Sequence, residues 1–383
     1  MRTHAIGALC AVMAGAAILA FGLAATAGAA ASPACRTHAM IAYVVSDASA
    51  TVTPIRTATS TPLKAIRVGI APVAIAITPN GKTAYVTNAL LNQVTPIFTA
   101  TCTVGKPIRA GEGPQVIAIT PNGRTAYAVN VEAGTVTPIF TATNTAGKAI
   151  PVGSFPWDIA ITPNGRIAYV VNNGSGTVTP IFTATNTAGQ PIRVGLTANA
   201  IVITPSGRTA YVVDEAAGTV TPIFTATNTA GQPIKIPHSS RFSPESAPGQ
   251  RLIVSAPNGK TVYVASQSAG TVTPIFTATN TAGKPIKVGK DPFALAITPN
   301  GKVVEVVNQA SGTVTPIYTA VNRAGKAITV GSTPWAIAIT PNGKTAYVVN
   351  NRSDTVTPIS IVTGKAGTAI SVGSRPIAIA ITR

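Results

Sequence analysis

Short apolar stretches, each followed by turn residues, recur along the chain between Ile41 and Arg383. Four successive stretches are "AIAIT" (Ala74–Thr78), "TAYVTN" (Thr83–Asn88), "QVTPIFTAT" (Gln93–Thr101) and "KPIRAG" (Lys106–Gly111). Their apolar residues alternate with polar ones or are β-branched, and no segment has apolar residues spaced at i, i+3, i+4 and i+7. The pattern predicts strands throughout and an all-β chain.

The residues between the stretches predict how the strands connect. "Pro-Asn-Gly" joins the first stretch of a unit to the second, and it suits a type I turn followed by a left-handed glycine, which closes a hairpin. The proline inside "VTPI", in the third stretch, has no N–H to give to a strand ladder. We expect that strand either to bulge at the proline or to leave this direction unpaired.

The tetrapeptide "VTPI" shows that the pattern is an internal repeat. It occurs eight times, and the successive spacings are 42, 42, 42, 42, 52, 42 and 42 residues. A period near 42 residues is typical of propellers built from four-stranded blades. The threonines of the eight copies are Thr53, Thr95, Thr137, Thr179, Thr221, Thr273, Thr315 and Thr357.

The two ends of the repeat complement each other. The chain enters the repeat at a second strand, "IAYVV" (Ile41–Val45), and ends on a first strand, "PIAIAIT" (Pro376–Thr382). Pairing of this last strand with the N-terminal strands completes one blade and closes a ring without exposed sheet edges. We therefore predict a β-propeller of eight four-stranded antiparallel blades, with seven blades plus an irregular terminal unit as the alternative.

Composition indicates a folded protein, and the N-terminal segment indicates its location. The chain has 383 residues, of which 46% are hydrophobic and 10% charged, so it is too apolar to be disordered as a whole. Residues 1–31 contain an apolar run that ends in small residues, which predicts a cleaved signal peptide, with an uncleaved membrane anchor as the alternative. Residues 32–40 would then form an N-terminal segment and 41–383 a single propeller domain. We expect a secreted or cell-envelope protein without a membrane span after cleavage.

The cysteines fit an oxidising compartment. Cys10 lies in the predicted signal peptide, which leaves Cys35 and Cys102 in the mature chain. An even count in a secreted protein predicts one disulfide between Cys35 and Cys102, and two free thiols are the alternative.

The second stretch of each unit carries a family resemblance. "YVTN" at Tyr85–Asn88, "AYAVN" at Ala126–Asn130 and "AYVVN" at Ala168–Asn172 and Ala346–Asn350 stand between "ITPNGKT"-type and "GTVTPI"-type segments. In these motifs the chain resembles the YVTN-repeat β-propeller family of secreted and surface-layer proteins, from about Ile41 to the end. The resemblance implies the propeller fold, and the wider group of similar folds includes lactonases and lyases. The chain departs from the family in having eight units rather than seven and in "TPIFTATNTAGKPI", where the family tends to have an Asp-containing turn.

One face of the predicted ring carries the repeated turns, and we call it the turn face. A cation follows seven of the Asn-Gly or Ser-Gly turns, and the net charge of the chain is +18. Such a ring of charge would attract an anionic cell-surface polymer, although solvated turn cations are the simpler interpretation. Nucleic acid is an unlikely partner because no aromatic residues are interleaved with the cations. The cations of this basic rim are Lys82, Arg124, Arg166, Arg208, Lys260, Lys302 and Lys344.

The opposite face, which we call the variable face, carries the crossovers between blades, where the copies differ. Residues that differ among repeats are better candidates for function than residues that every blade shares. Aromatic rings and charges around a propeller entrance predict a ligand-binding or partner-binding surface, whereas rings that plug the central channel are the alternative. The candidates are Trp157, Trp335, Phe293, Phe155, Asp158, Asp291, Glu112, Gln115, Asn199, Arg251 and Arg375.

One crossover carries an insertion near residues 237–250, which accounts for the 52-residue spacing. A long loop on the variable face is a candidate recognition element. It includes His238, near Ser239 and Glu245, which we interpret as an ordinary loop histidine rather than part of a nucleophilic triad.

The residues that commonly perform catalysis are sparse. The sequence has no cluster of His, Asp or Glu at metal-ligand spacing and no glycine-rich phosphate loop, so we expect neither a metal nor a cofactor. We expect a secreted, monomeric, non-catalytic propeller that binds a protein or carbohydrate through its variable face. The alternative is a lactonase- or lyase-like enzyme with its site at the channel mouth, where Asp158, Asp291, Glu112, Arg251 and Arg375 could serve.

Overall fold

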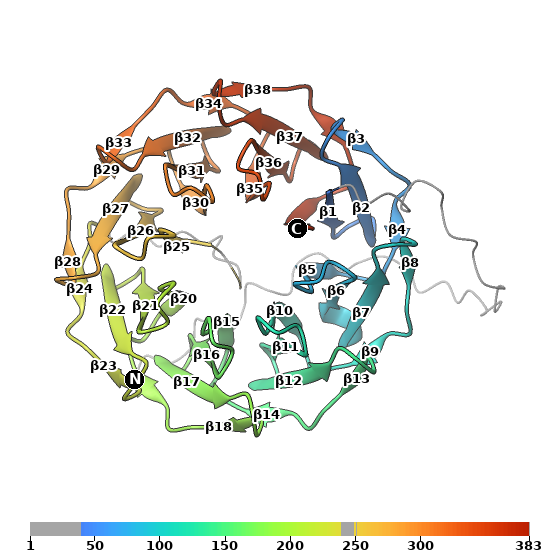
Figure 1. Ribbon diagram of the computed structural model, residues 1–383, viewed down its shortest axis with the longest axis horizontal. Helices are drawn as coiled ribbons and strands as arrows, with labels where there is room; N and C mark the ends of the chain where they lie inside the picture. Colours follow the sequence, from blue (N-terminus) through green and yellow to red (C-terminus); the bar gives the residue numbers. More distant parts are fainter. Residues whose placement is uncertain (1–39, 239–248, 250, 383) are drawn as a thin grey trace, which may run out of the picture. The chain divides into compact units, whose positions relative to one another are not determined.

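A computed structural model describes residues 40–238, 249 and 251–382. These residues form a β-propeller of eight antiparallel blades (Figure 1). The predicted signal peptide at 1–31 and most of the insertion lie outside the described residues. Within the described ranges the one helical segment is a single 3-10 turn, Ala89–Leu91, and no helix there is long and apolar enough to span a bilayer.

The first strand of each blade lies innermost and contacts the first strands of the two neighbouring blades, all the way around the ring (Figure 1). Most of these strands begin with proline, directly after a crossover on the variable face. They are β5 (Pro72–Ile77), β10 (Pro114–Ile119), β15 (Pro156–Ile161), β20 (Ala198–Ile203), β25 (Ile253–Ser255), β30 (Pro292–Ile297), β35 (Pro334–Ile339) and β40 (Pro376–Ile381).

The second strand is almost completely buried between the blades on either side, which explains its unbroken run of apolar residues. Its final residue is asparagine in most blades, and the side-chain nitrogen bonds within the blade: Asn130 Nδ2 donates to Thr135 Oγ1 (3.0 Å) and to Thr137 Oγ1 (2.9 Å). The last residue of "YVTN"-type motifs and the threonines of "TVT" therefore form one hydrogen-bonded unit. The second strands are β1 (Ile41–Ser46), β6 (Thr83–Asn88), β11 (Thr125–Asn130), β16 (Ile167–Asn172), β21 (Thr209–Asp214), β26 (Thr261–Ser266), β31 (Val303–Asn308) and β36 (Thr345–Asn350).

The third strand pairs with the second in continuous register through its proline. Tyr263 lies opposite Pro274, for example, and no bulge interrupts that ladder. Of the two outcomes expected at the proline, the structure shows the second: the strand does not bulge, and the proline is left without a ladder partner on the side of the fourth strand. The third strands are β2 (Thr51–Arg56), β7 (Gln93–Phe98), β12 (Thr135–Phe140), β17 (Thr177–Phe182), β22 (Thr219–Phe224), β27 (Thr271–Phe276), β32 (Thr313–Tyr318) and β37 (Thr355–Ser360).

The fourth strand is split into two short pieces because the proline cannot donate to it. In the blade of β27, one piece pairs with Ile275 and Phe276, and the other pairs with Thr271 and Val272. The first piece begins before the predicted fourth stretch: β8 (Thr103–Val104) lies between "QVTPIFTAT" (Gln93–Thr101) and "KPIRAG" (Lys106–Gly111). The pieces are β3 (Thr61–Pro62) and β4 (Ile66–Arg67), β8 (Thr103–Val104) and β9 (Ile108–Arg109), β13 (Thr145–Ala146) and β14 (Ile150–Pro151), β18 (Thr187–Ala188) and β19 (Ile192–Arg193), β23 (Thr229–Ala230) and β24 (Ile234–Lys235), β28 (Thr281–Ala282) and β29 (Ile286–Lys287), β33 (Arg323–Ala324) and β34 (Ile328–Thr329), and β38 (Lys365–Ala366) and β39 (Ile370–Ser371).

The ring closes as the sequence predicts. The C-terminal strand β40 pairs antiparallel with the N-terminal β1. Ile41 N donates to Thr382 Oγ1 (2.8 Å), and Thr382 N donates to Ile41 O (2.9 Å). Eight blades are thus confirmed, and the seven-bladed alternative is wrong.

The "Pro-Asn-Gly" turn between the first and second strands of a blade also has the predicted conformation. Gly81 N donates to Thr78 O (2.8 Å), and Gly81 has a φ of +70°, in the left-handed region. The side chain of Asn80 accepts a hydrogen bond from Lys82 N (3.0 Å), which stabilises the turn.

A buried tyrosine of the second strand binds each blade to the next. Tyr85 Oη donates to Asn144 Oδ1 (2.6 Å), in the turn after the third strand of the following blade. Burial raises the pKa of Tyr85 to about 12, so its hydroxyl remains a donor at neutral pH. Asn144 has a φ of +54°, a left-handed conformation that asparagine tolerates better than most residues. Equivalent pairs are Tyr127 with Asn186, Tyr169 with Asn228, Tyr211 with Asn280, and Tyr263 with Asn322.

At the ring closure, other contacts replace the Tyr–Asn pair. Tyr347 bonds to Ser60 (3.0 Å) across the closure. Cys102 occupies the asparagine position that follows Tyr43 and is disulfide-bonded. Cys35, its predicted partner, lies outside the described residues.

The pairing is interrupted in one blade. Glu305 in β31 replaces the tyrosine, and Gly364 replaces the asparagine that would receive its hydroxyl. Glu305 is 2% exposed, and its Oε2 is buried without a hydrogen-bond partner. Burial raises the pKa of Glu305 to about 7.

We predict that Glu305 makes the stability of the propeller depend on pH. Because the folded state favours the protonated acid, its contribution is fully present below the ordinary pKa of 4.5 and is lost as the pH rises through about 7. The variant Glu305→Gln should therefore gain about 2–3 kcal/mol relative to the native chain between pH 5 and pH 8. Urea denaturation of both proteins at the two pH values measures this difference, and a constant difference would contradict the prediction.

We also predict that the missing pair can be restored. A Cβ at Gly364 would meet no atom within 4 Å, and its φ of +62° suits asparagine. The double variant Glu305→Tyr, Gly364→Asn should be more stable than the sum of the single variants by about 1 kcal/mol, the usual value of one hydrogen bond. Strict additivity in a double-mutant cycle would show that no such bond forms.

Candidate functional site

Each inner strand carries one displaced residue at its variable-face end, beside the channel mouth. A β-bulge follows the first residue of the inner strand, for example between Pro156 and Asp158, so that Trp157 is the extra residue. Bulges re-aim side chains and leave the ladder on either side intact. The residues in this position, which we call the mouth residues, are Val73, Gln115, Trp157, Asn199, Phe293, Trp335 and Ile377, with Arg251 at the equivalent place before β25.

Six consecutive mouth residues, from Gln115 to Trp335, are polar or aromatic. The inner strands that carry them are neighbours in the ring (Figure 1), so these residues occupy consecutive positions along one arc. Val73 and Ile377, where the ring closes, are aliphatic. The structure thus brings together five of the predicted candidates with a sixth, Gln115, at the edge of the arc.

The aromatic mouth residues differ in their exposure to solvent. Phe293 packs against Trp335, with ring centroids 4.5 Å apart and an angle of 52° between the rings. Phe293 is only 1% exposed, whereas Trp335 and Trp157 are half-buried. Trp157 Nε1 is buried without an acceptor. Phe155, two residues earlier, is 56% exposed and has a φ of +48°.

Asp158 links two inner strands beside the mouth. Its Oδ1 accepts a hydrogen bond from Ile159 N (2.8 Å), and its Oδ2 accepts one from Ile201 N in the next blade (3.0 Å). Burial raises the pKa of Asp158 to about 7, although these two bonds and the positive charge of Arg251 act in the opposite direction. At neutral pH the group is therefore divided between acid and carboxylate.

A second acid, Glu215, was not among the predicted candidates. It follows the second strand β21, and its Oε1 accepts a hydrogen bond from Gln267 N (3.0 Å) in the next blade. Asn199 Nδ2 donates to its Oε2 (3.4 Å). Burial raises the pKa of Glu215, and the charge of Asp291 adds to that effect, while the two hydrogen bonds oppose it.

The loop position of Glu215 holds a buried amide in each of the next two blades. Gln267 and Gln309 occupy the equivalent position in the next two blades, and Gln309 N donates to Asp291 O (2.8 Å). Both atoms of the Gln267 amide, Gln309 Nε2 and Asn199 Oδ1 are buried without a partner. The sequence does contain a signal for this position, because its residue varies among the blades. Other blades have Ala89, Val131, Asn173 and Asn351 there.

The described end of the insertion reaches the same arc. Gly249 N donates to Trp157 O (2.9 Å), and a Cβ on Gly249 would lie 3.2 Å from Val116 Cγ2. His238 lies beside Gly218 at the start of the insertion. Ser239 and Glu245, the partners that a triad would need, lie outside the described residues.

Two predicted candidates lie apart from this arc. Arg375 Nη2 is 3.7 Å from Asp47 Oδ2, where the ring closes, and its backbone N–H donates to Asp354 Oδ1 (2.7 Å). Glu112 is exposed, and its backbone carbonyl accepts a hydrogen bond from Ala133 (3.2 Å). Neither side chain is among the hydrogen-bond partners found for Asp158 or Glu215 in the described residues.

The seven cations of the basic rim are all exposed. Each donates its backbone N–H to the Asn or Ser side chain two residues earlier, as Arg124 does to Asn122 (3.0 Å). These contacts stabilise the turns and leave the charged groups in solvent. In the part of the chain that the structure describes, no three His, Cys, Asp or Glu side chains could together hold a metal ion.

Comparison with known proteins supports the propeller class. The family model described as "Lactonase, 7-bladed beta-propeller" matches residues 200–326, less than half of the chain. These residues include Glu215, Arg251, Gln267, Asp291 and Gln309. No protein with curated function matches the sequence.

Solved structures share the fold at low identity. A dihydro-heme d1 dehydrogenase, solved with its ligand DHE, matches with a TM-score of 0.73 and 12% identity over 89% of this chain and 74% of that one. Hydrazine synthase from Kuenenia stuttgartiensis has a TM-score of 0.61 and 22% identity over 76% and 95%. A protein described as a 6-phosphogluconolactonase from Bacteroides fragilis has a TM-score of 0.59 and 16% identity over 90% and 99%. The chain is thus a β-propeller with a partial sequence match to propeller lactonases, and these structures show the shared fold.

We predict that the charge of Arg251 lowers the pKa of Asp158 against the larger effect of burial. Replacing it as Arg251→Gln removes the nearby positive charge, so the pKa of Asp158 should rise above about 7, by roughly half a unit to one unit. Carbon-13 NMR of labelled aspartate, assigned with Asp158→Asn, measures the titration. The matched control Arg375→Gln, whose ionic partner is Asp47, should leave it unchanged; an unchanged titration in Arg251→Gln would refute the assignment.

Proposed function

We propose that this protein is a secreted, non-catalytic propeller that binds a small carbohydrate at the channel mouth on its variable face. The observation that carries the proposal is a set of buried amide atoms that lie in neighbouring blades and have no hydrogen-bond partner among the described residues: Asn199 Oδ1, both polar atoms of the Gln267 amide, and Gln309 Nε2. A buried polar group without a partner costs free energy, which a bound ligand recovers by completing its hydrogen bonds.

The chemistry of the arc suits a ligand with several hydroxyl groups. An amide offers both a donor and an acceptor, and each sugar hydroxyl can serve as either. The half-buried rings of Trp157 and Trp335 add apolar surface for the C–H face of a sugar. Glu215 and Asp158 supply further acceptors between these groups.

The placement outside the cell rests on the sequence. The apolar segment at 1–31 and the YVTN-type motifs support a secreted or surface-layer propeller, and the disulfide of Cys102 is consistent with an oxidising compartment. We propose a monomer, because ring closure already pairs the first strand with the last.

A second candidate function is hydrolysis of a lactone ring. It is favoured by the match of residues 200–326 to the lactonase family and by the pKa of Asp158 near 7, which suits a general base at neutral pH. Asp158 would remove a proton from water as the water oxygen attacks the lactone carbonyl carbon, and it would return that proton to the ring oxygen as the C–O bond of the ring breaks. Arg251 would stabilise the negative charge that develops on the carbonyl oxygen.

Intrinsic fluorescence tests the binding proposal directly. Trp157 and Trp335 are the two tryptophans of the chain, and both are mouth residues. Titration with a panel of neutral mono- and disaccharides should change the fluorescence for at least one sugar. The double variant Gln267→Ala, Gln309→Ala should weaken that binding about tenfold or more, the cost of losing two hydrogen bonds.

The matched control is Gln232→Ala, which alters an exposed glutamine of an outer loop and should not change the affinity. Absence of a fluorescence change with every sugar would contradict carbohydrate binding at the mouth. Turnover of δ-gluconolactone that disappears in Asp158→Asn would overturn the non-catalytic assignment in favour of the second candidate.

A further inference from the structure

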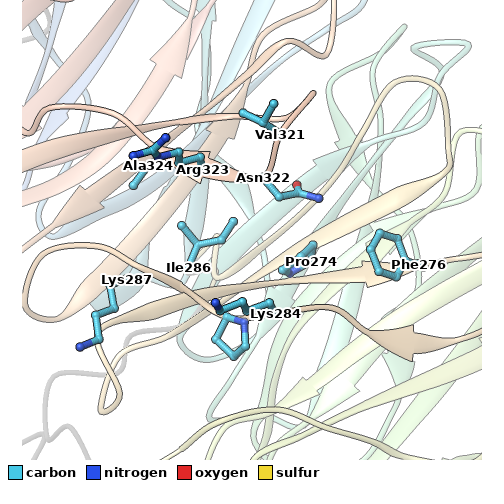
Figure 2. Close-up of a pocket in the computed structure, with 10 residues that line it drawn as sticks. Pro274, Phe276, Lys284, Ile286, Lys287, Val321, Asn322, Arg323 and Ala324 are labelled. Carbon is cyan, nitrogen blue, oxygen red and sulfur yellow. The ribbon is translucent and has the colours of Figure 1, made fainter.

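A groove at the outer edge of the ring lies between two neighbouring blades. It has a volume of about 420 Å³, and one wall comes from β27 to β29 while the other comes from the segment leading into β33. Figure 2 shows Lys284, Ile286 and Lys287 on the first wall and Val321 to Ala324 on the second. This volume falls within the range of small-ligand sites.

An aromatic ring at one end of the groove is fixed but still open to solvent. A Cβ at Gly283 would lie 3.0 Å from Phe276 Cε2 and 3.0 Å from Pro274 Cγ, so only glycine lets the ring pack this closely. Phe276 nevertheless remains 40% exposed, and Val321 on the opposite wall is 68% exposed. The groove therefore presents a rigid apolar surface with little to cover it.

Three cations surround this apolar surface. Lys284, Lys287 and Arg323 line the groove and are exposed, and the ten lining residues include no Asp or Glu. The ion pair found among the described residues, Arg375 with Asp47, lies elsewhere. The positive charge of the groove is thus not neutralised by the described lining.

The same groove recurs two blades earlier without two of these charges. It has a volume of about 450 Å³ and is lined by Pro180, Phe182 and Gln190, with Asn228 opposite. Gln190 stands where the first groove has Lys284, and Thr229 stands where it has Arg323. Both glycine-packed rings and both asparagines are retained, so the shape is a property of the repeat, whereas the pair Lys284 and Arg323 is absent from the second groove.

We infer that the groove lined by Phe276, Lys284 and Arg323 binds an acidic oligosaccharide. The ring of Phe276 and the side chain of Val321 would contact the C–H face of a sugar, and the three cations would bind its carboxylate or sulfate groups. A single ring per groove suits a sugar better than a nucleic acid strand, whose successive bases stack on successive aromatic rings. This site is separate from the channel mouth and does not depend on the function proposed there.

Calorimetric titration of the whole chain with tetragalacturonate tests the inference. One variant removes two cations from the first groove, and another adds two cations to the second groove. Lys284→Gln with Arg323→Thr gives the groove the residues that the second groove has at these two positions and should weaken binding about tenfold or more. Gln190→Lys with Thr229→Arg places the two cations in the second groove and should add one ligand to the stoichiometry of the native chain. Phe276→Ser, which introduces the residue that Ser360 provides in another blade, should also weaken binding.

Three results would overturn the inference. The first is no binding of tetragalacturonate, or equal binding by the native chain and the Lys284→Gln, Arg323→Thr variant. The second is equally tight binding of the uncharged galactose tetramer, which would remove the role of charge. The third is tighter binding of an eight-nucleotide oligothymidylate with the same dependence on Lys284 and Arg323, which would identify a nucleic acid site instead.

Discussion

Each blade depends on the next through a buried hydroxyl that must find its acceptor across the boundary between them. The tyrosine belongs to the second strand of one blade and the asparagine to a left-handed turn of the following blade, as in the pair Tyr127 and Asn186. Neither residue can change alone without leaving a buried polar group unpaired or straining the turn. This reciprocal requirement explains why long phrases of the chain are repeated almost without variation.

The exceptions follow the same constraint. Where glutamate replaces tyrosine at position 305, glycine replaces asparagine at position 364, so donor and acceptor are lost together. Where asparagine is absent after Tyr43, Cys102 forms a covalent bond. Near the ring closure, where the two ends of the chain meet, Tyr347 bonds to Ser60 rather than to an asparagine. The contacts between blades there thus differ from those elsewhere in the ring.

Residues can vary where backbone hydrogen bonds hold the strands together and the side chains lie outside the strand ladder. The bulge at the start of each inner strand is one such place, since the ladder continues on both sides of Trp157 or Asn199. The outer grooves are another, because the glycine-packed ring of Phe276 or Phe182 maintains the shape while the flanking charges differ. A repeat protein of this kind can therefore carry distinct sites on two separated surfaces without altering its core.

The sequence by itself determined the number of blades and the closure of the ring, because strand periodicity and the phase of the repeat are local properties that a constant spacing exposes. It also indicated the mouth residues, since Trp157, Phe293 and Trp335 vary at one fixed place in the repeat. Only the tertiary structure decided that Glu215, Gln267 and Gln309 join them, that Arg375 pairs instead with Asp47, and that burial raises the pKa of Asp158 to about 7. Those outcomes depend on contacts between neighbouring blades and on exclusion of water, and neither is encoded in the spacing of residues along one strand.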